Sequence, residues 1–191
     1  MINDGLIDSI RETFGKVTYS HKTHEKDAEI FARKADLWKL SEVILIAATT
    51  TGVISVVFDA GKCAQVVTAL LSAVSLLVAI YQFRFLPDQQ ITAHRITARN
   101  LWLVREKLMI LLCDIRDNAL DDATARDRRD KLTEELSRIY ENAPHNSPIA
   151  YREAQKALRS NNDMTFDDGE IDSFLPPAAR STSSHSCSNN E

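Results

Sequence analysis

Two long apolar runs lie close together in the first half of the chain. One covers Val43–Phe58 and the other Cys63–Ile80, and neither contains a charged residue. A helix needs roughly 18–20 apolar residues to cross the hydrocarbon core of a bilayer. The second run reaches this length alone, and the first reaches it when Leu40–Glu42 are included. The pattern therefore predicts membrane-spanning helices at residues 40–58 and 63–85.

The residues between the two runs indicate how the predicted spans are connected. Residues 59–62, Asp-Ala-Gly-Lys, are enough to turn an antiparallel helical hairpin, with Gly61 able to adopt the left-handed conformation found at helix ends. Lys62 is the base of this turn, whereas residues 22–39 and 84–107 each carry five bases. Because positive charge concentrates on the cytoplasmic side, we expect both termini to be cytoplasmic. In a soluble bundle, the alternative, each run would be expected to keep one polar face.

The rest of the chain shows helical periodicity. Residues 1–39 carry apolar side chains at three- and four-residue steps and predict a cytoplasmic helix, with an interruption expected near Ser20–Lys26. A second helix is predicted from about Gln89 to Asp117. Its apolar residues are spaced 3, 4, 3, 4, which is typical of a seam that packs against another helix of the chain or of a neighbouring subunit. This candidate oligomer seam comprises Leu101, Val104, Leu108, Leu111 and Ile115.

Further helical elements follow before the pattern is lost. A helix is predicted over Ala123–Tyr140, with Leu132, Leu136 and Ile139 on one face, and Ser147-Pro148 is a typical start for another. Residues 88–160 thus form a predicted cytoplasmic bundle within a domain spanning 1–160. Residues 161–191 have no periodicity, carry six acids against one base, and are expected to be disordered. The predicted fold is an all-α membrane protein with a two-span hairpin.

Charge and cysteine content narrow the functional classes. Residues 1–160 carry 22 bases and 21 acids, so the basic excess of a nucleic-acid-binding protein is missing. The three cysteines are far apart and contain no CxxC pair, which disfavours a disulfide framework. No nucleophile, base and oxyanion group can be assembled, so we predict neither an enzyme nor a cofactor site.

Three short motifs are better explained without a ligand. Gly61-Lys62 has neither the first glycine nor the Ser or Thr of a phosphate-binding loop. His21, His24 and Glu25 have metal-compatible spacing, but two imidazoles without a well-placed third ligand favour a solvated surface, and no metal is predicted. The run Ala125–Lys131 alternates bases with acids and is typical of a solvated helix face.

Polar and small residues inside the two predicted spans are the remaining candidate functional positions. They form one stripe on the second span and a small-residue face on the first. In lipid, such faces allow close helix packing, and polar groups at membrane depth also line aqueous paths. The candidates for helix packing or pore lining are Gln65, Thr68, Ser72 and Ser75 on the second span, and Ala48, Thr51, Gly52 and Ser55 on the first.

The layout resembles a known family over roughly residues 5–160. The similarity lies in LWKLSEVILIAATT, the turn FDAGKC, the stretch FRFLPDQQITAHRITARNLWLVREKL and IYENAPHNSPIAYREAQKAL. These resemble the SLATT family, the SMODS and SLOG associating two-transmembrane effector domain. The resemblance implies a multi-pass effector of prokaryotic conflict systems in the inner membrane, proposed to form pores or otherwise disrupt that membrane. It also implies a sensor or a nucleotide-second-messenger synthetase as partner.

Two functions are expected from these observations. In the first, several copies of the chain associate, because two spans cannot enclose a lumen, and the homo-oligomer permeabilises the lipid bilayer. In the second, the hairpin is a non-pore anchor for cytoplasmic helices that recruit a partner.

Overall fold

The structure, a computed structural model, describes residues 4–57, 61–84, 87–165, 168–174 and 176. All regular secondary structure within these ranges is helical, which confirms the predicted all-α class. Residues 1–154 form one compact unit and residues 155–191 a second. The helices are α1 Asp4–Val57, α2 Gly61–Arg84, α3 Pro87–Arg116, α4 Asp122–Glu141, α5 Pro148–Ser160 and α6 Asp168–Phe174.

Helix α1 is one continuous helix of 54 residues. The interruption expected at Ser20–Lys26 is wrong. Its polar residues need no break in the backbone, because they find partners while remaining helical. The Thr23 hydroxyl donates to the Tyr19 carbonyl one turn earlier, and the His21 ring donates to the Ala98 carbonyl of α3. The sequence pattern changes here because these residues are buried between helices.

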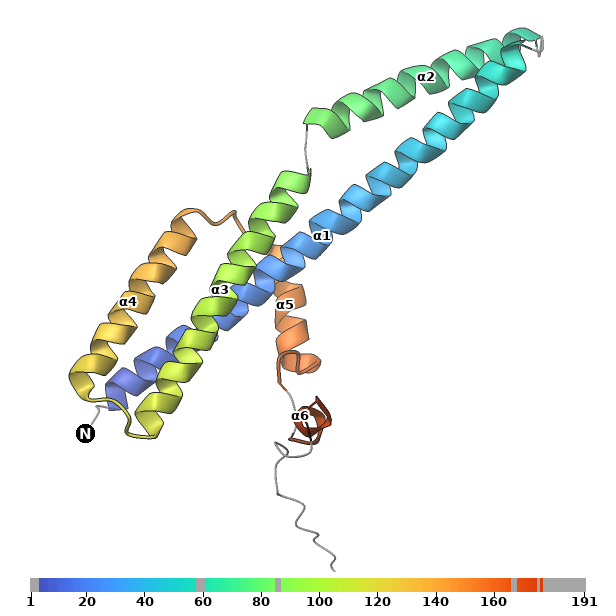
Figure 1. The fold of residues 1–191 in the computed structure, drawn as a ribbon. Coiled ribbons are helices and arrows are strands. Elements are labelled where there is room, and N and C mark those ends of the chain that lie inside the picture. Colours follow the sequence, from blue (N-terminus) through green and yellow to red (C-terminus); the bar gives the residue numbers. More distant parts are fainter. Residues whose placement is uncertain (1–3, 58–60, 85–86, 166–167, 175, 177–191) are drawn as a thin grey trace, which may run out of the picture. The chain divides into compact units, whose positions relative to one another are not determined.

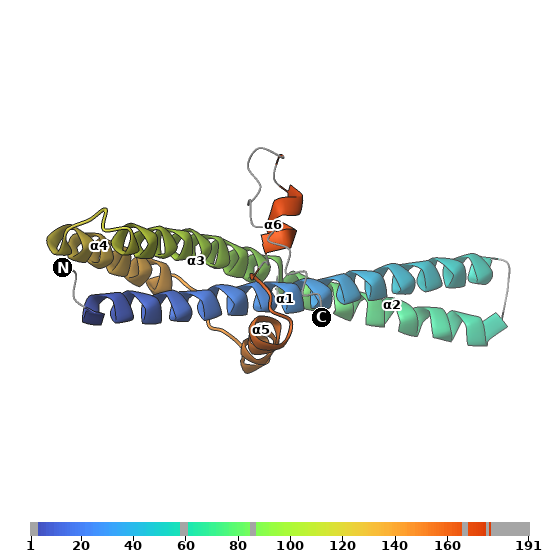
Figure 2. The same ribbon diagram turned by 90° about the horizontal axis from the view of Figure 1, so that it is seen from below.

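The two ends of α1 pack against different helices of the first unit. Helix α2 runs back along the C-terminal end of α1, whereas α3 runs along its N-terminal part and α4 along α3 (Figures 1 and 2). The contact of α1 with α3 and α4 forms the hydrophobic core. Its most buried members include Leu6, Ile10 and Val17 of α1, Leu101, Val104, Leu108, Leu111 and Ile115 of α3, and Ala125, Leu132 and Leu136 of α4.

The candidate oligomer seam is therefore covered within the chain. Its five side chains are between 0% and 5% exposed, packed among residues of α1 and α4. Of the two arrangements that the heptad spacing allows, packing within the chain is the one observed. A second subunit could reach the seam only if α3 separated from α1 or α4.

Several helix boundaries follow the capping signals of the sequence. The Asp121 carboxylate accepts a hydrogen bond from the Thr124 amide at 2.9 Å and caps α4. Hydrogen bonding from the Thr124 side chain, and then from its amide, holds the pKa of Asp121 below its usual value. The Ser147 hydroxyl accepts from the Ala150 amide at 3.1 Å and caps α5, with Pro148 in the first turn as predicted. Gly61 has a φ of +84°, so its left-handed conformation is also confirmed, at the start of α2.

The second unit contains one correction. Residues 161–191 were expected to be disordered, yet α6 forms at Asp168–Phe174 within them. Acidic residues at its start favour a helix, because the N-terminal end of the helix dipole is positive. The Ser173 hydroxyl also donates to the Glu170 carbonyl. The expectation for residues 177–191 lies outside the described residues.

Candidate functional site

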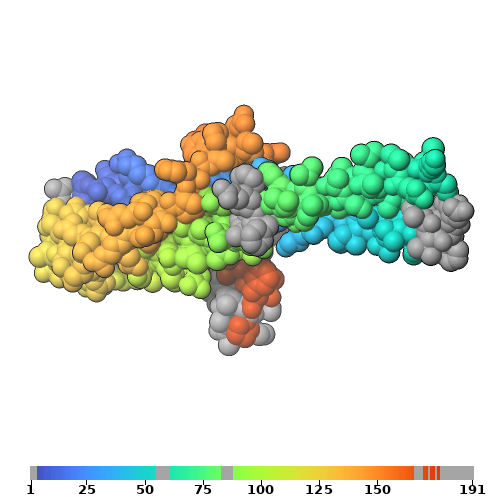
Figure 3. Space-filling view, turned by 90° about the horizontal axis from the view of Figure 1, so that it is seen from above, coloured from blue at the N-terminus to red at the C-terminus, as the bar shows by residue number. Residues whose placement is uncertain are grey.

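The hairpin of α1 and α2 exposes most of its apolar side chains. Among the described residues, these two helices are long and apolar enough to cross a membrane. No residue of the 18-residue apolar window of α1 is buried, and 6% of the corresponding window of α2 is. The soluble-bundle alternative requires these windows to be mostly buried. Figure 3 shows α2 and the adjoining end of α1 with no other segment over them on the face drawn.

The two helices approach closely where a small residue faces a polar one. A Cβ atom added to Gly52 would overlap the Thr68 hydroxyl and lie 3.1 Å from its Cγ2 atom. Thr68 is 8% exposed, and its hydroxyl donates to the Ala64 carbonyl of its own helix. About one turn away on α1 and two turns away on α2, the hydroxyl oxygens of Thr49 and Ser75 lie 3.4 Å apart across the hairpin. Polar groups and glycine therefore hold the pair together, as is usual in lipid.

The structure divides the candidate stripe on α2 between two environments. Thr68 and Ser75 face α1, whereas Gln65 and Ser72 are exposed. The Ser72 hydroxyl donates to the Thr68 carbonyl, so its bonding capacity is partly used within the helix. Gln65 forms no hydrogen bond with the described residues. It lies four residues after Gly61, about 6 Å along the helix from the turn.

The small-residue face of α1 is divided in the same way. Ala48 and Gly52 are half-buried, whereas Thr51 is exposed and its hydroxyl donates to the Ala47 carbonyl. Thr49, which sequence reasoning did not select, faces α2. The side chain of Ser55 lies outside the described residues. The structure thus brings Gly52 together with Thr68 and Thr49 together with Ser75, half-buries Ala48, and leaves Thr51, Gln65 and Ser72 on the outside.

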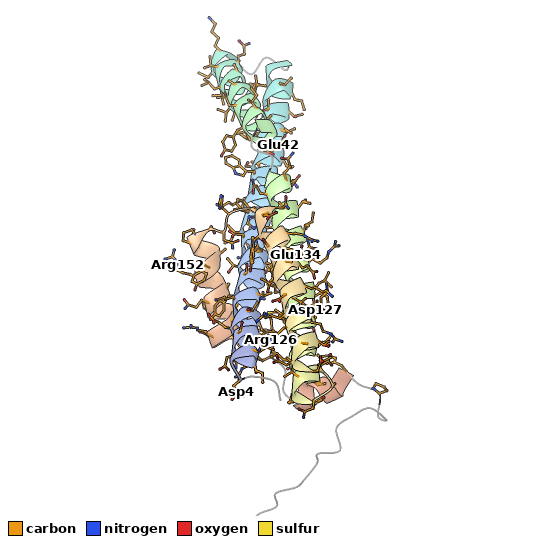
Figure 4. All side chains as sticks on the ribbon, turned by 90° about the vertical axis from the view of Figure 1, so that its left-hand side faces the viewer. Asp4, Glu42, Arg126, Asp127, Glu134 and Arg152 are labelled. Carbon is orange, nitrogen blue, oxygen red and sulfur yellow. The ribbon has the colours of Figure 1, made fainter. Side chains whose placement is uncertain are left out.

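The other end of the hairpin has the residues typical of a membrane boundary. The rings of Trp38 and Tyr81 lie 5.1 Å apart, and the Gln82 amide donates to the Trp38 carbonyl at 3.3 Å. Aromatic residues with a polar edge concentrate at membrane interfaces. Figure 4 shows Glu42 near this end, with the labelled charged residues of α4 on the side of Glu42 away from the turn.

Beyond this boundary, a buried polar cluster joins α1 to α3. The Nδ1 atoms of His24 and His94 lie 3.0 Å apart, and the side chains are 1% exposed. His21, 5% exposed, donates from Nδ1 to the Ala98 carbonyl at 2.9 Å. Burial lowers the pKa of His24 to about 4, with the charge of His94 acting in the same direction and Asp27 opposing it. Burial also lowers the pKa of His94, again opposed by Asp27.

A buried carboxylate extends the cluster to the start of α5. Asp27 is 1% exposed, and its two oxygens accept hydrogen bonds from the Ser147 hydroxyl at 2.6 Å and the Ser147 amide at 3.0 Å. A carboxylate can remain charged in a buried site when such donors satisfy it. Ser147 therefore caps α5 and anchors the start of this helix to α1.

The environment of these histidines differs from the one that the local sequence pattern predicts. That pattern indicates a solvated surface for His21 and His24, and does not select Asp27, His94 or Ser147 as partners. His94 lies 70 residues from His24, so no local spacing could connect them. Within the described part of the chain, no three His, Cys, Asp or Glu side chains are arranged to hold a metal. In the run Ala125–Lys131, the charged residues are exposed or half-buried as expected of a solvated face, whereas Ala125 is buried in the hydrophobic core.

These features define a class: an all-helical protein with two candidate membrane-spanning helices joined in a hairpin. A family model described as SMODS and SLOG-associating 2TM effector domain family 4 matches residues 6–170, so the chain belongs to this SLATT family. The SLATT family is an effector domain family, not a known enzyme family, and its members are two-transmembrane effectors of conflict and defence systems. Comparison with curated proteins and with solved structures gave no match.

Proposed function

We propose that the chain is a defence effector of the inner membrane that oligomerises and permeabilises the bilayer on activation. Both termini lie in the cytoplasm, and a sensor or a nucleotide signal from a synthetase supplies the trigger. The observation that carries this proposal is the hairpin, whose apolar windows are almost entirely uncovered. Such a surface is stable in lipid and would aggregate in water.

The geometry of one chain supports the oligomerisation in this proposal. Two helices in contact along their length leave no space for a lumen between them, so a pore requires several hairpins. The exposed amide of Gln65 gives these hairpins a polar group to place toward one another or toward water. In this proposal, Gln65, Ser72 and Thr51 line the pore because they are exposed on the hairpin, and Thr68 and Ser75 join them only if α1 and α2 separate.

The test is ion leakage from liposomes that contain the purified full-length chain. Changing Thr68 to leucine would disturb the contact with Gly52, so the substitutions must keep the shape of the side chains. The set Thr51→Val, Gln65→Leu, Thr68→Val, Ser72→Ala and Ser75→Ala removes polarity at nearly constant volume. We expect this variant to insert and oligomerise as the unmodified chain does, and to lose at least about tenfold in leak rate.

A matched control shows whether a loss of leakage comes from the lost polar groups or from any substitution in α2. Leu70 and Leu77 are more than 60% exposed on the same helix, and their replacement by methionine leaves the stripe intact. This control should leak at the unmodified rate. Equal leakage from the polar-stripe variant and the control would exclude a path lined by these residues.

A second function is supported by a different surface. Helix α3 exposes Trp102, Leu103, Met109 and Ile110, each at least 41%, outside the candidate membrane segment. Exposed apolar patches of this kind are typical of protein interaction sites. In this alternative the hairpin is an anchor and α3 recruits the partner. The changes Trp102→Ser and Ile110→Ser would then abolish partner recruitment, while polar-stripe substitutions in α2 would leave it intact.

A further inference from the structure

The cluster of His24, His94 and Asp27 is not used by the proposed membrane path. It lies where α1 and α3 cross, between the hydrophobic core and the candidate membrane segment. The rings of His24 and His94 are tilted against each other with centroids 5.1 Å apart, and the Phe31 ring packs on His94. Buried titratable groups that bridge two helices can make the contact between them depend on pH.

The geometry of the two rings limits how many protons the pair can bind. The Nδ1 atoms of His24 and His94 lie 3.0 Å apart, so one nitrogen must donate a hydrogen and the other must accept it. Full protonation of both rings would place two N–H groups against each other and two positive charges in a buried site. His21 differs, because its Nδ1 faces a carbonyl and its Nε2 lies 3.6 Å from the Glu25 carboxylate.

We propose that the His24–His94 contact is a proton-operated link that holds α3 to α1 at neutral pH and releases it when the surrounding solution becomes acidic. Release would loosen the part of α3 that follows the hairpin, and would give a second copy access to side chains that the chain now covers. The coupling of this release to membrane leakage rests on the proposed function; the release itself does not.

The direction of the pH effect follows from the two lowered pKa values. A histidine titrates near 6.5 when exposed, whereas the pKa of His24 in the closed contact is about 4. Separated helices therefore bind more protons than joined helices below pH 6.5, so acid favours separation down to about pH 4. The charged and titratable groups acting on the pair are Asp27 and His21, both from α1. The Asp27 carboxylate favours protonation of the pair, and its two oxygens also accept hydrogen bonds from Ser147, a neutral residue immediately before α5.

Two measurements on the full-length chain in lipid nanodiscs test the link directly. Nitrogen NMR of labelled histidine rings reports the protonation of each of the five histidines as pH falls from 7.5 to 5. Amide hydrogen exchange, corrected for its intrinsic pH dependence, reports the opening of residues 17–31 and 91–101. We expect protection in both segments to fall about tenfold or more between pH 6.5 and 5.5, with the rings of His24 and His94 protonated in the opened form.

The decisive variant is His24→Asn with His94→Asn. The asparagine amide occupies the place of Nδ1 and can keep a hydrogen bond, but it does not titrate. Its protection should change less than about twofold over the same pH range, because no group at the contact takes up a proton. His145→Asn is the matched control, since His145 is exposed and lies outside the cluster, and it should respond as the unmodified chain does. The single variant His94→Asn gives a second reading if the double variant unfolds.

The outcomes separate this inference from the proposed function. Unchanged protection of the unmodified chain at pH 5.5, or an equal fall in the double asparagine variant, would overturn the proton-operated link. Liposome leakage measured in parallel bears on the pore alone. Acid-dependent opening without leakage at any pH would support the proton-operated link and reject the permeabilising function. Leakage without pH-dependent opening would support the permeabilising function and reject the link.

Discussion

The two ends of α1 show that one helix can serve two different surroundings. In the first 36 residues of α1, the apolar residues Leu6, Ile10 and Val17 are at most 3% exposed and meet α3 and α4. At the other end, Leu40, Val43 and Ile44 are all at least 57% exposed although their surroundings in the sequence are more apolar. Hydrophobicity therefore does not predict burial within this chain. An apolar segment left uncovered by protein is adapted to a different solvent, and lipid is the solvent that fits.

The largest expected difference between the two regions is the loss of unfolding free energy when a leucine in each is replaced by alanine. Leu108 is 1% exposed in the core, and Leu108→Ala should lower the free energy of unfolding of the helical core by about 2–5 kcal/mol, through lost burial and the cavity left behind. Leu77 on α2 is 66% exposed, and lipid tails surround it equally well before and after helix pairing. Leu77→Ala should therefore change this free energy by less than about 0.5 kcal/mol. Urea denaturation in detergent, followed by circular dichroism, compares them.

The second expected effect is at the junction of α1 and α5. Asp27→Ala removes both hydrogen bonds to Ser147, which should cost about 1.5–3 kcal/mol because the acceptor is charged. We expect faster hydrogen exchange in the first turn of α5 and faster proteolysis in residues 142–147. The matched control is Asp36→Ala, since Asp36 is exposed on the same helix. If the two variants exchange alike, Asp27 does not anchor α5.

The third prediction compares two glycines of α1. Gly52→Ala places a methyl group against Thr68 and should weaken the hairpin by about 1–3 kcal/mol. Gly15→Ala meets nothing within 4 Å and should stabilise the helix by up to about 1 kcal/mol. The approach of α1 to α2 can be measured by disulfide cross-linking. The variant carries Thr49→Cys and Ser75→Cys, with the native cysteines replaced by serine. Cross-linking should fall with Gly52→Ala and recover when Thr68→Ala is added, and an unaffected yield would mean that the helices do not meet at Gly52.

The sequence predicted the features that depend on neighbouring residues. The two apolar runs, the cap at Ser147 and the seam from Leu101 to Ile115 all repeat over a few residues or depend on a short turn, and each is visible in the chain alone. The left-handed conformation of Gly61 is also predicted, because four residues between two helices leave few conformations. These predictions rest on local propensity and periodicity.

The features that sequence reasoning missed depend on residues far apart in the chain. His24 and His94 are 70 residues apart, and Asp27 and Ser147 are 120 residues apart. A histidine pattern on one helix is equally compatible with a solvated surface and with a buried contact, and only the position of α3 decides between them. The same holds for Thr49, which looked like any span residue until α2 placed Ser75 opposite it.

The smallest expected effect concerns the ion pair between α3 and α4. The Lys107 ammonium lies 2.7 Å from a Glu135 oxygen, with side chains 50% and 40% exposed. Water screens such a pair, and ordering two long side chains opposes it, so a double-mutant cycle with Lys107→Ala and Glu135→Ala should give a coupling of about 0.2–1 kcal/mol. The coupling should fall further in 1 M salt, where the screening length is about 3 Å. Because α3 and α4 are already held by Leu108, Leu132 and Leu136, neither single variant should release α4. A coupling above about 2 kcal/mol would mean instead that charge, rather than the apolar core, holds these helices together. Apolar burial would then no longer distinguish the core from the hairpin.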